Sequence, residues 1–144
     1  CLGRSHPVYR AIPDLLRESV TPYAWYMRVA DAPGFVRHIA PALEARLADS
    51  PLAGYSGVLP INEYRGGFRM GFERGALTLI ERFQPPQRVE GAGFPPLVFL
   101  QLLFGYRSLA ELRASFPDCV VRAEAAVLLD VLFPRCESQV IAIH

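Results

Sequence analysis

Hydrophobic and polar positions follow regular patterns along most of the chain, and the pattern changes from one segment to the next. Residues 24–29 place Trp25, Met27 and Val29 on one face, an alternation that predicts a strand. Residues 35–48 carry an apolar side chain at every fourth position, which predicts a single amphipathic helix. Three further alternating segments predict an antiparallel meander of short strands: residues 58–64, 68–73 and 76–83.

The most apolar segment lies at residues 97–104, where Gln101 is the one polar side chain. Pro95 and Pro96 suit the first turn of a helix, and Gly105 suits its left-handed C-terminal cap. Because the segment is apolar nearly all round, we expect it to be buried, either as an ordinary core helix or as the wall of an apolar cavity. It is about half as long as the roughly 18 residues that cross a bilayer, which argues against a membrane anchor.

Two more helices and a last strand are predicted toward the end of the chain. Ser108 and Glu111 form an S-x-x-E capping box, which predicts the start of a short helix. Apolar positions over residues 121–132 predict another helix, which Pro134 ends. The apolar run in residues 138–144 predicts the final strand.

The order of these elements predicts an α+β domain. One strand, one helix, three strands, three helices and one strand follow each other, with residues 84–93 as a loop after the meander. Clustered antiparallel strands and clustered helices favour an antiparallel-rich sheet that is covered on one face by helices. A length of 144 residues with 51% hydrophobic side chains suits one such domain.

Charge and cysteine content narrow the possible partners and compartment. The formal net charge of +1 gives no field that would steer nucleic acid or a membrane surface, so neither partner is expected. All 15 basic residues are Arg, so Schiff-base and P-loop lysine chemistry are excluded. The three Cys residues have no C-x-x-C spacing, and no signal peptide is evident, so free thiols in the cytoplasm are expected.

No candidate motif completes a catalytic, cofactor or metal site. The glycines at residues 65–68 lie between predicted strands, where a hairpin turn is favoured over a phosphate cradle. Residues 54–57 form only half of a nucleophile elbow. Cys119 lies near a helix boundary, where its thiol is either activated or simply a small buried side chain, and the second is favoured. The three His residues lack metal-ligand spacing.

Three longer segments, in this order, resemble a known family. They are "WYMRVADAPGFVRHIAPALEARLADSPLAGYSG", "FPPLVFLQLLFGYRSLAELRASFPDC" and "LLDVLFPRCESQVIAI". Together they are similar to the C-terminal domain of bacterial GNAT-family acetyltransferases of the enhanced intracellular survival (Eis) group. The resemblance implies a sterol-carrier-protein-like domain over residues 24–144, with residues 1–23 as a linker or edge segment from an upstream GNAT domain.

The resemblance also implies a role within a larger enzyme. The parent protein would be an acetyl-CoA-dependent N-acetyltransferase that forms homo-oligomers, and this domain would pack on its GNAT domains and shape the pocket for the amine acceptor. The acetyl-CoA motif R/Q-x-x-G-x-G/A does not occur in this chain, so no cofactor is expected here and the segment alone should be inactive. In that family a terminal carboxylate acts as general base, and His144 would supply it.

Two other functions remain open. The domain is alternatively a sterol-carrier-type binder of a lipid or fatty acyl group, with the segment around residues 97–104 lining a tunnel and Gln101 or Arg107 orienting a polar head group. The lining residues would be Phe99, Gln101, Leu102, Leu103 and Tyr106. A third possibility is a protein-binding module with an exposed aromatic patch formed by Tyr55, Tyr64 or Phe68.

Overall fold

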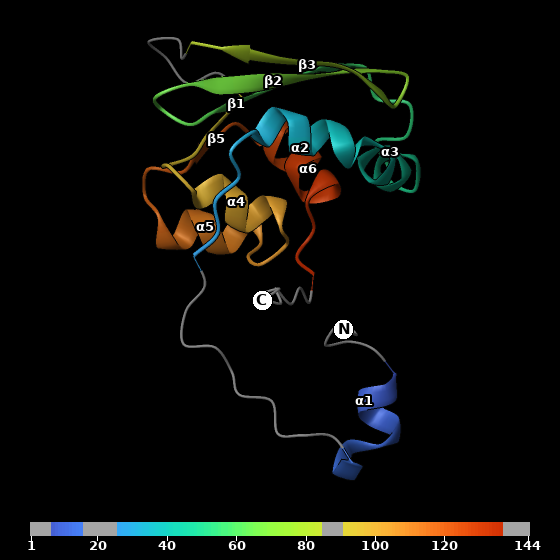
Figure 1. The fold of residues 1–144 in the computed structure, drawn as a ribbon. Coiled ribbons are helices and arrows are strands. Elements are labelled where there is room, and N and C mark those ends of the chain that lie inside the picture. Colours follow the sequence, from blue (N-terminus) through green and yellow to red (C-terminus); the bar gives the residue numbers. More distant parts are fainter. Residues whose placement is uncertain (1–6, 16–25, 85–90, 137–144) are drawn as a thin grey trace.

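The computed structural model describes residues 7–15, 26–84 and 91–136, and Figure 1 shows how their elements are arranged. A five-stranded sheet has the strand order β3-β2-β1-β4-β5, with β1 and β4 parallel and the other neighbours antiparallel. The predicted α+β class and the predicted meander are therefore confirmed. The strands are β1 (Gly57–Asn62), β2 (Gly67–Glu73), β3 (Ala76–Phe83), β4 (Ala92–Gly93) and β5 (Val120–Val121).

The helices α2 to α6 lie together on one face of the sheet (Figure 1). They are α2 (Ala32–His38), α3 (Ala40–Ala48), α4 (Val98–Leu103), α5 (Leu109–Ser115) and α6 (Ala123–Leu132). The N-terminal segment contains α1 (Val8–Ala11) and the 3₁₀ turn η1 (Pro13–Leu15). No helix in the described part of the chain is both long enough and apolar enough to cross a membrane.

Strands β4 and β5 correct the sequence-based prediction. Residues 84–93 were expected to form a loop, but Ala92 and Gly93 pair with the end of β1. Val121 was expected in a helix, but it pairs with Ala92, and α6 starts two residues later. Two-residue strands are too short to show an alternating pattern, so their pairing partners rather than their own residues define them. The predicted strand at residues 138–144 lies outside the described residues.

The helix predicted over residues 35–48 is wrong as a single element, because the chain forms α2 and α3 with a break at Ile39. Pro41 explains the break. It has no N–H group for the carbonyl of Arg37, and its ring crowds that carbonyl in a continuous helix. Pro41 instead occupies the first turn of α3, where a missing N–H group has no helical partner to lose.

The strand predicted over residues 24–29 is also wrong for the part that is described, since residues 26–29 belong to no strand. The alternation itself is visible in the burial of the side chains. Met27 and Val29 are half-buried, whereas Tyr26 and Arg28 are exposed. Val29 packs against the hydrophobic core. The segment therefore uses its apolar side for packing without the backbone pairing that defines a strand.

The meander has a covered face and an open face. The covered face carries Leu59, Met70 and Phe68, which are buried beneath the helices. On the open face, the paired registers place Val58, Gly71 and Leu79 in one row across the three strands, and Pro60, Arg69 and Glu81 in the next. Arg69 and Glu81 form an ion pair (3.7 Å), and both side chains are about half-exposed.

Side chains of α2 and α3 form hydrogen bonds with the backbone of β3, which is an edge strand of the sheet. The N–H group of Leu77 donates to Oε1 of Glu44 in α3 (2.8 Å). Nη2 of Arg37 in α2 donates to the carbonyl of Ile80 (3.1 Å). Both backbone groups belong to the edge strand, where a partner strand would otherwise bond them. Side chains that occupy such groups oppose the addition of another strand.

Helix α4 forms the centre of the hydrophobic core. Phe99 is fully buried, and its ring centroid lies 5.5–5.8 Å from those of Phe68, Phe94 and Phe133. The helix is shorter than predicted because Leu97 adopts a left-handed backbone (φ 66°), so it starts at Val98. The predicted left-handed Gly105 is confirmed (φ 65°).

The predicted capping box at the start of α5 is confirmed. The N–H group of Glu111 donates to Oγ of Ser108 (3.2 Å), and the N–H group of Ser108 donates to Oε2 of Glu111 (2.7 Å). Arg135 also forms an ion pair with Glu111 (2.9 Å).

Removing the cap hydroxyl is expected to destabilise the domain modestly. The substitution Ser108→Ala should lower the free energy of unfolding by about 1 kcal/mol, because the N–H group of Glu111 loses its acceptor. Urea denaturation would measure the change. Ser108→Asp is the control, since its carboxylate also accepts at an N-cap, and it should stay within about 0.5 kcal/mol of the original protein. An equal loss for both substitutions would contradict this assignment.

Candidate ligand cavity between β1 and α6

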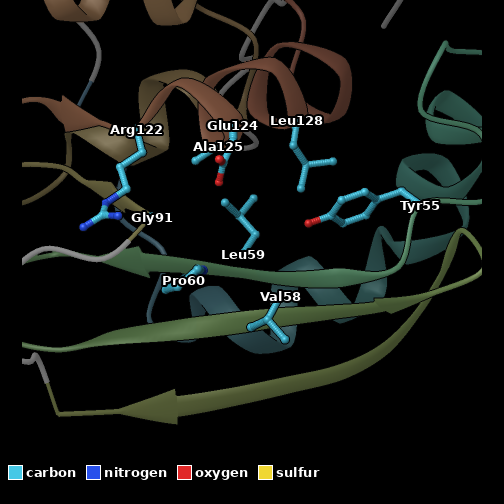
Figure 2. Close-up of a pocket in the computed structure, with 9 residues that line it drawn as sticks. All are labelled: Tyr55, Val58, Leu59, Pro60, Gly91, Arg122, Glu124, Ala125 and Leu128. Carbon is cyan, nitrogen blue, oxygen red and sulfur yellow. The ribbon is translucent and has the colours of Figure 1, made fainter.

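A cavity of about 510 Å³ lies between β1 and the first turns of α6. Figure 2 shows Arg122, Gly91 and Pro60 at one end and Tyr55 at the other, with the sheet on one side and α6 on the opposite side. The volume falls within the range of small-ligand sites, about 300–1,000 Å³. The lining residues are Tyr55, Val58, Leu59, Pro60, Gly91, Arg122, Glu124, Ala125 and Leu128.

The cavity is next to a part of β1 that has no neighbouring strand among the described residues. Ile61 lies opposite Ala92 in the parallel ladder, and the next bond toward the start of β1 would need an N–H group on residue 60. Pro60 has none, so the pairing stops there. Gly91 turns the chain away with φ 74°, and its backbone passes so close to Pro60 that a Cβ atom would lie 2.6 Å from the Pro60 carbonyl oxygen.

The unpaired part of β1 directs backbone groups toward the cavity. The carbonyl of Asn62 accepts from the N–H group of Phe94 (2.8 Å), so the backbone of Asn62 faces β4. Successive residues of a strand in an antiparallel pair face opposite edges. Val58, four positions before Asn62, therefore has its N–H and C=O groups on the same edge, beyond the end of β4. No described residue forms a hydrogen bond to either group.

Helix α6 supplies the opposite wall. Arg122 is the N-cap residue of this helix, and its N–H group donates to the carbonyl of Gly91 (3.0 Å). Ala125 and Leu128 are buried and give the wall an aliphatic surface. Glu124 is exposed, and in Figure 2 its carboxylate points down from α6 toward the sheet. Within the described residues, neither the Arg122 guanidinium nor the Glu124 carboxylate forms a hydrogen bond or an ion pair.

Tyr55 closes the far end of the cavity. Its carbonyl accepts from the N–H group of Gly75 in the β2–β3 turn (2.8 Å), and its ring meets Phe72 edge-on with centroids 6.0 Å apart. The hydroxyl lies over Gly57, where an added Cβ atom would overlap it. The ring is thus fixed by the meander, and Figure 2 shows the hydroxyl pointing into the space between β1 and α6.

The cavity combines aliphatic side chains with polar groups in similar proportion. It offers hydrogen-bond donors from Arg122, acceptors from Glu124, and both from Tyr55 and the backbone of Val58. The formal charges of Arg122 and Glu124 cancel each other. Among the described residues, no group of three or more His, Cys, Asp or Glu residues is placed to hold a metal ion. The arrangement is suited to binding an uncharged polar group beside an aliphatic one.

The residues predicted to line an apolar tunnel lie elsewhere. Phe99, Leu102 and Leu103 are buried in the core, Gln101 is half-buried, and Tyr106 is 60% exposed. None of the five lines the cavity between β1 and α6. Their role in ligand binding stays a prediction. The predicted base, the carboxylate of His144, lies outside the described residues.

The structure also shows the burial of Cys119, Phe68 and Tyr64, which the sequence offered as a thiol site or an aromatic patch. Cys119 is a buried free thiol, and burial, together with the charge of Asp118, raises its pKa, so the small buried side chain favoured from the sequence is confirmed. The proposed aromatic patch is wrong for Phe68, which is buried. Tyr64 is 41% exposed, and its hydroxyl donates to the carbonyl of Asp118.

The sequence does not indicate the cavity, because the lining residues come from separate segments of the chain. Pro60 within an alternating strand pattern was the available signal, since proline in a strand interrupts pairing on one edge. Arg122 is the N-cap residue of α6 and Glu124 lies in its first turn, but the helix was predicted to start at Val121, so the sequence did not place these two residues at its N-terminus.

Comparison of the chain with protein-family models, with curated proteins and with solved structures gave no match.

Proposed function

We propose that this chain is the C-terminal assembly domain of a GNAT-type N-acetyltransferase, in which it packs on the catalytic domain and shapes the pocket for the amine acceptor. The sterol-carrier-protein-like fold and the acetyl-CoA cofactor of the parent protein are parts of the same proposal. The sequence resemblance to the Eis-like group supports it. The α+β architecture with helices on one face of a sheet is compatible with it.

The observation that carries the proposal is the open face of the meander. Val58 is 55% exposed and Leu79 is 42% exposed, and they lie in one row on either side of Gly71. The next row holds the ion pair between Arg69 and Glu81, and the exposed Glu73 lies on the same face at the end of β2. A partly apolar face without an excess of positive charge suits contact with a second protein domain better than contact with nucleic acid or an anionic membrane. We assign it to the upstream catalytic domain.

The alternative, a carrier for a lipid or fatty acyl group, has less support. The aliphatic walls of the cavity beside β1 favour it, but the same cavity contains two charged side chains and a backbone edge. A hydrocarbon chain lying along β1 would leave the backbone groups of Val58 without hydrogen bonds, which costs free energy. Binding of decanoate to the purified domain would test this alternative.

The assembly role is tested with the full-length protein that contains this domain. With acetyl-CoA it should acetylate amines, and Leu79→Glu should lower kcat/KM by about tenfold, because a buried unpaired carboxylate weakens an interface. Val127→Glu is the matched control, since Val127 is 56% exposed on α6 and away from the open face. It should leave kcat/KM within about twofold. Absence of acetyl transfer to any amine, or equal effects of both substitutions, would contradict the proposal.

A further inference from the structure

We draw no further inference here: the strongest candidate, the cavity between β1 and α6, is walled in part by the buried side chains of Leu59, Ala125 and Leu128, and nothing among the described residues shows what would occupy it.

Discussion

The substitution Phe99→Ala is expected to lower the free energy of unfolding by about 3–5 kcal/mol, which is a large fraction of the stability of a small domain. Phe99 is fully buried, and its ring meets three other aromatic rings, those of Phe68, Phe94 and Phe133. Truncation leaves a cavity that rigid neighbours on the sheet, the β4–α4 connection and the end of α6 cannot fill. Urea denaturation followed by circular dichroism would give the value.

The neighbouring Tyr106 provides the control for Phe99. It is also aromatic and close in sequence, but it is 60% exposed. Tyr106→Ala should therefore change the free energy of unfolding by less than about 1 kcal/mol. If Phe99→Ala cost no more than Tyr106→Ala, α4 would not be the centre of the core, and a ligand tunnel around this helix would again become the better explanation of its apolar surface.

The second large effect is expected for Gly91→Ala, which should cost about 2–4 kcal/mol. Two causes add. The backbone of Gly91 has φ 74°, which a residue with a side chain adopts only with strain, and the new Cβ atom would lie 2.6 Å from the carbonyl oxygen of Pro60. Relief of this contact requires β4 to move away from β1, so the end of the cavity would also change shape.

Gly54 separates these two causes. It has nearly the same backbone angle, φ 76°, but no heavy atom lies within 4 Å of an added Cβ atom. Gly54→Ala should therefore show the conformational cost alone, about 1 kcal/mol. Thermal or urea unfolding of the two variants measures the difference. Equal losses would mean that the close approach of Gly91 to Pro60 does not constrain the edge of the sheet.

Local patterns were sufficient to predict the central part of the fold. Alternation gave the three strands of the meander, because one face of each strand is buried beneath helices. The Ser108–Glu111 capping box and the left-handed Gly105 were also predicted correctly, since each depends on bonds within a few residues. Elements defined by distant partners were missed. β4 exists only because Ala92 meets Ile61, and no pattern in two residues records that pairing.

The candidate site was harder to predict for the same reason. Its aliphatic members resemble any other core residues, and its charged members, Arg122 and Glu124, resemble ordinary surface residues in the sequence. What distinguishes the site is the missing N–H group of Pro60, beside which the pairing of β1 with β4 ends. That consequence depends on which strand lies next to β1, and strand order is set by tertiary packing rather than by local sequence.

The bonds from Glu44 and Arg37 to the backbone of β3 have a consequence for how copies of the molecule associate. An exposed edge on each side of a sheet permits end-to-end polymerisation, because every added copy presents a new edge to the next. Here two backbone groups of the β3 edge are already bonded by side chains of the same molecule. This occupation disfavours the addition of another copy at β3 and so opposes end-to-end growth of the sheet.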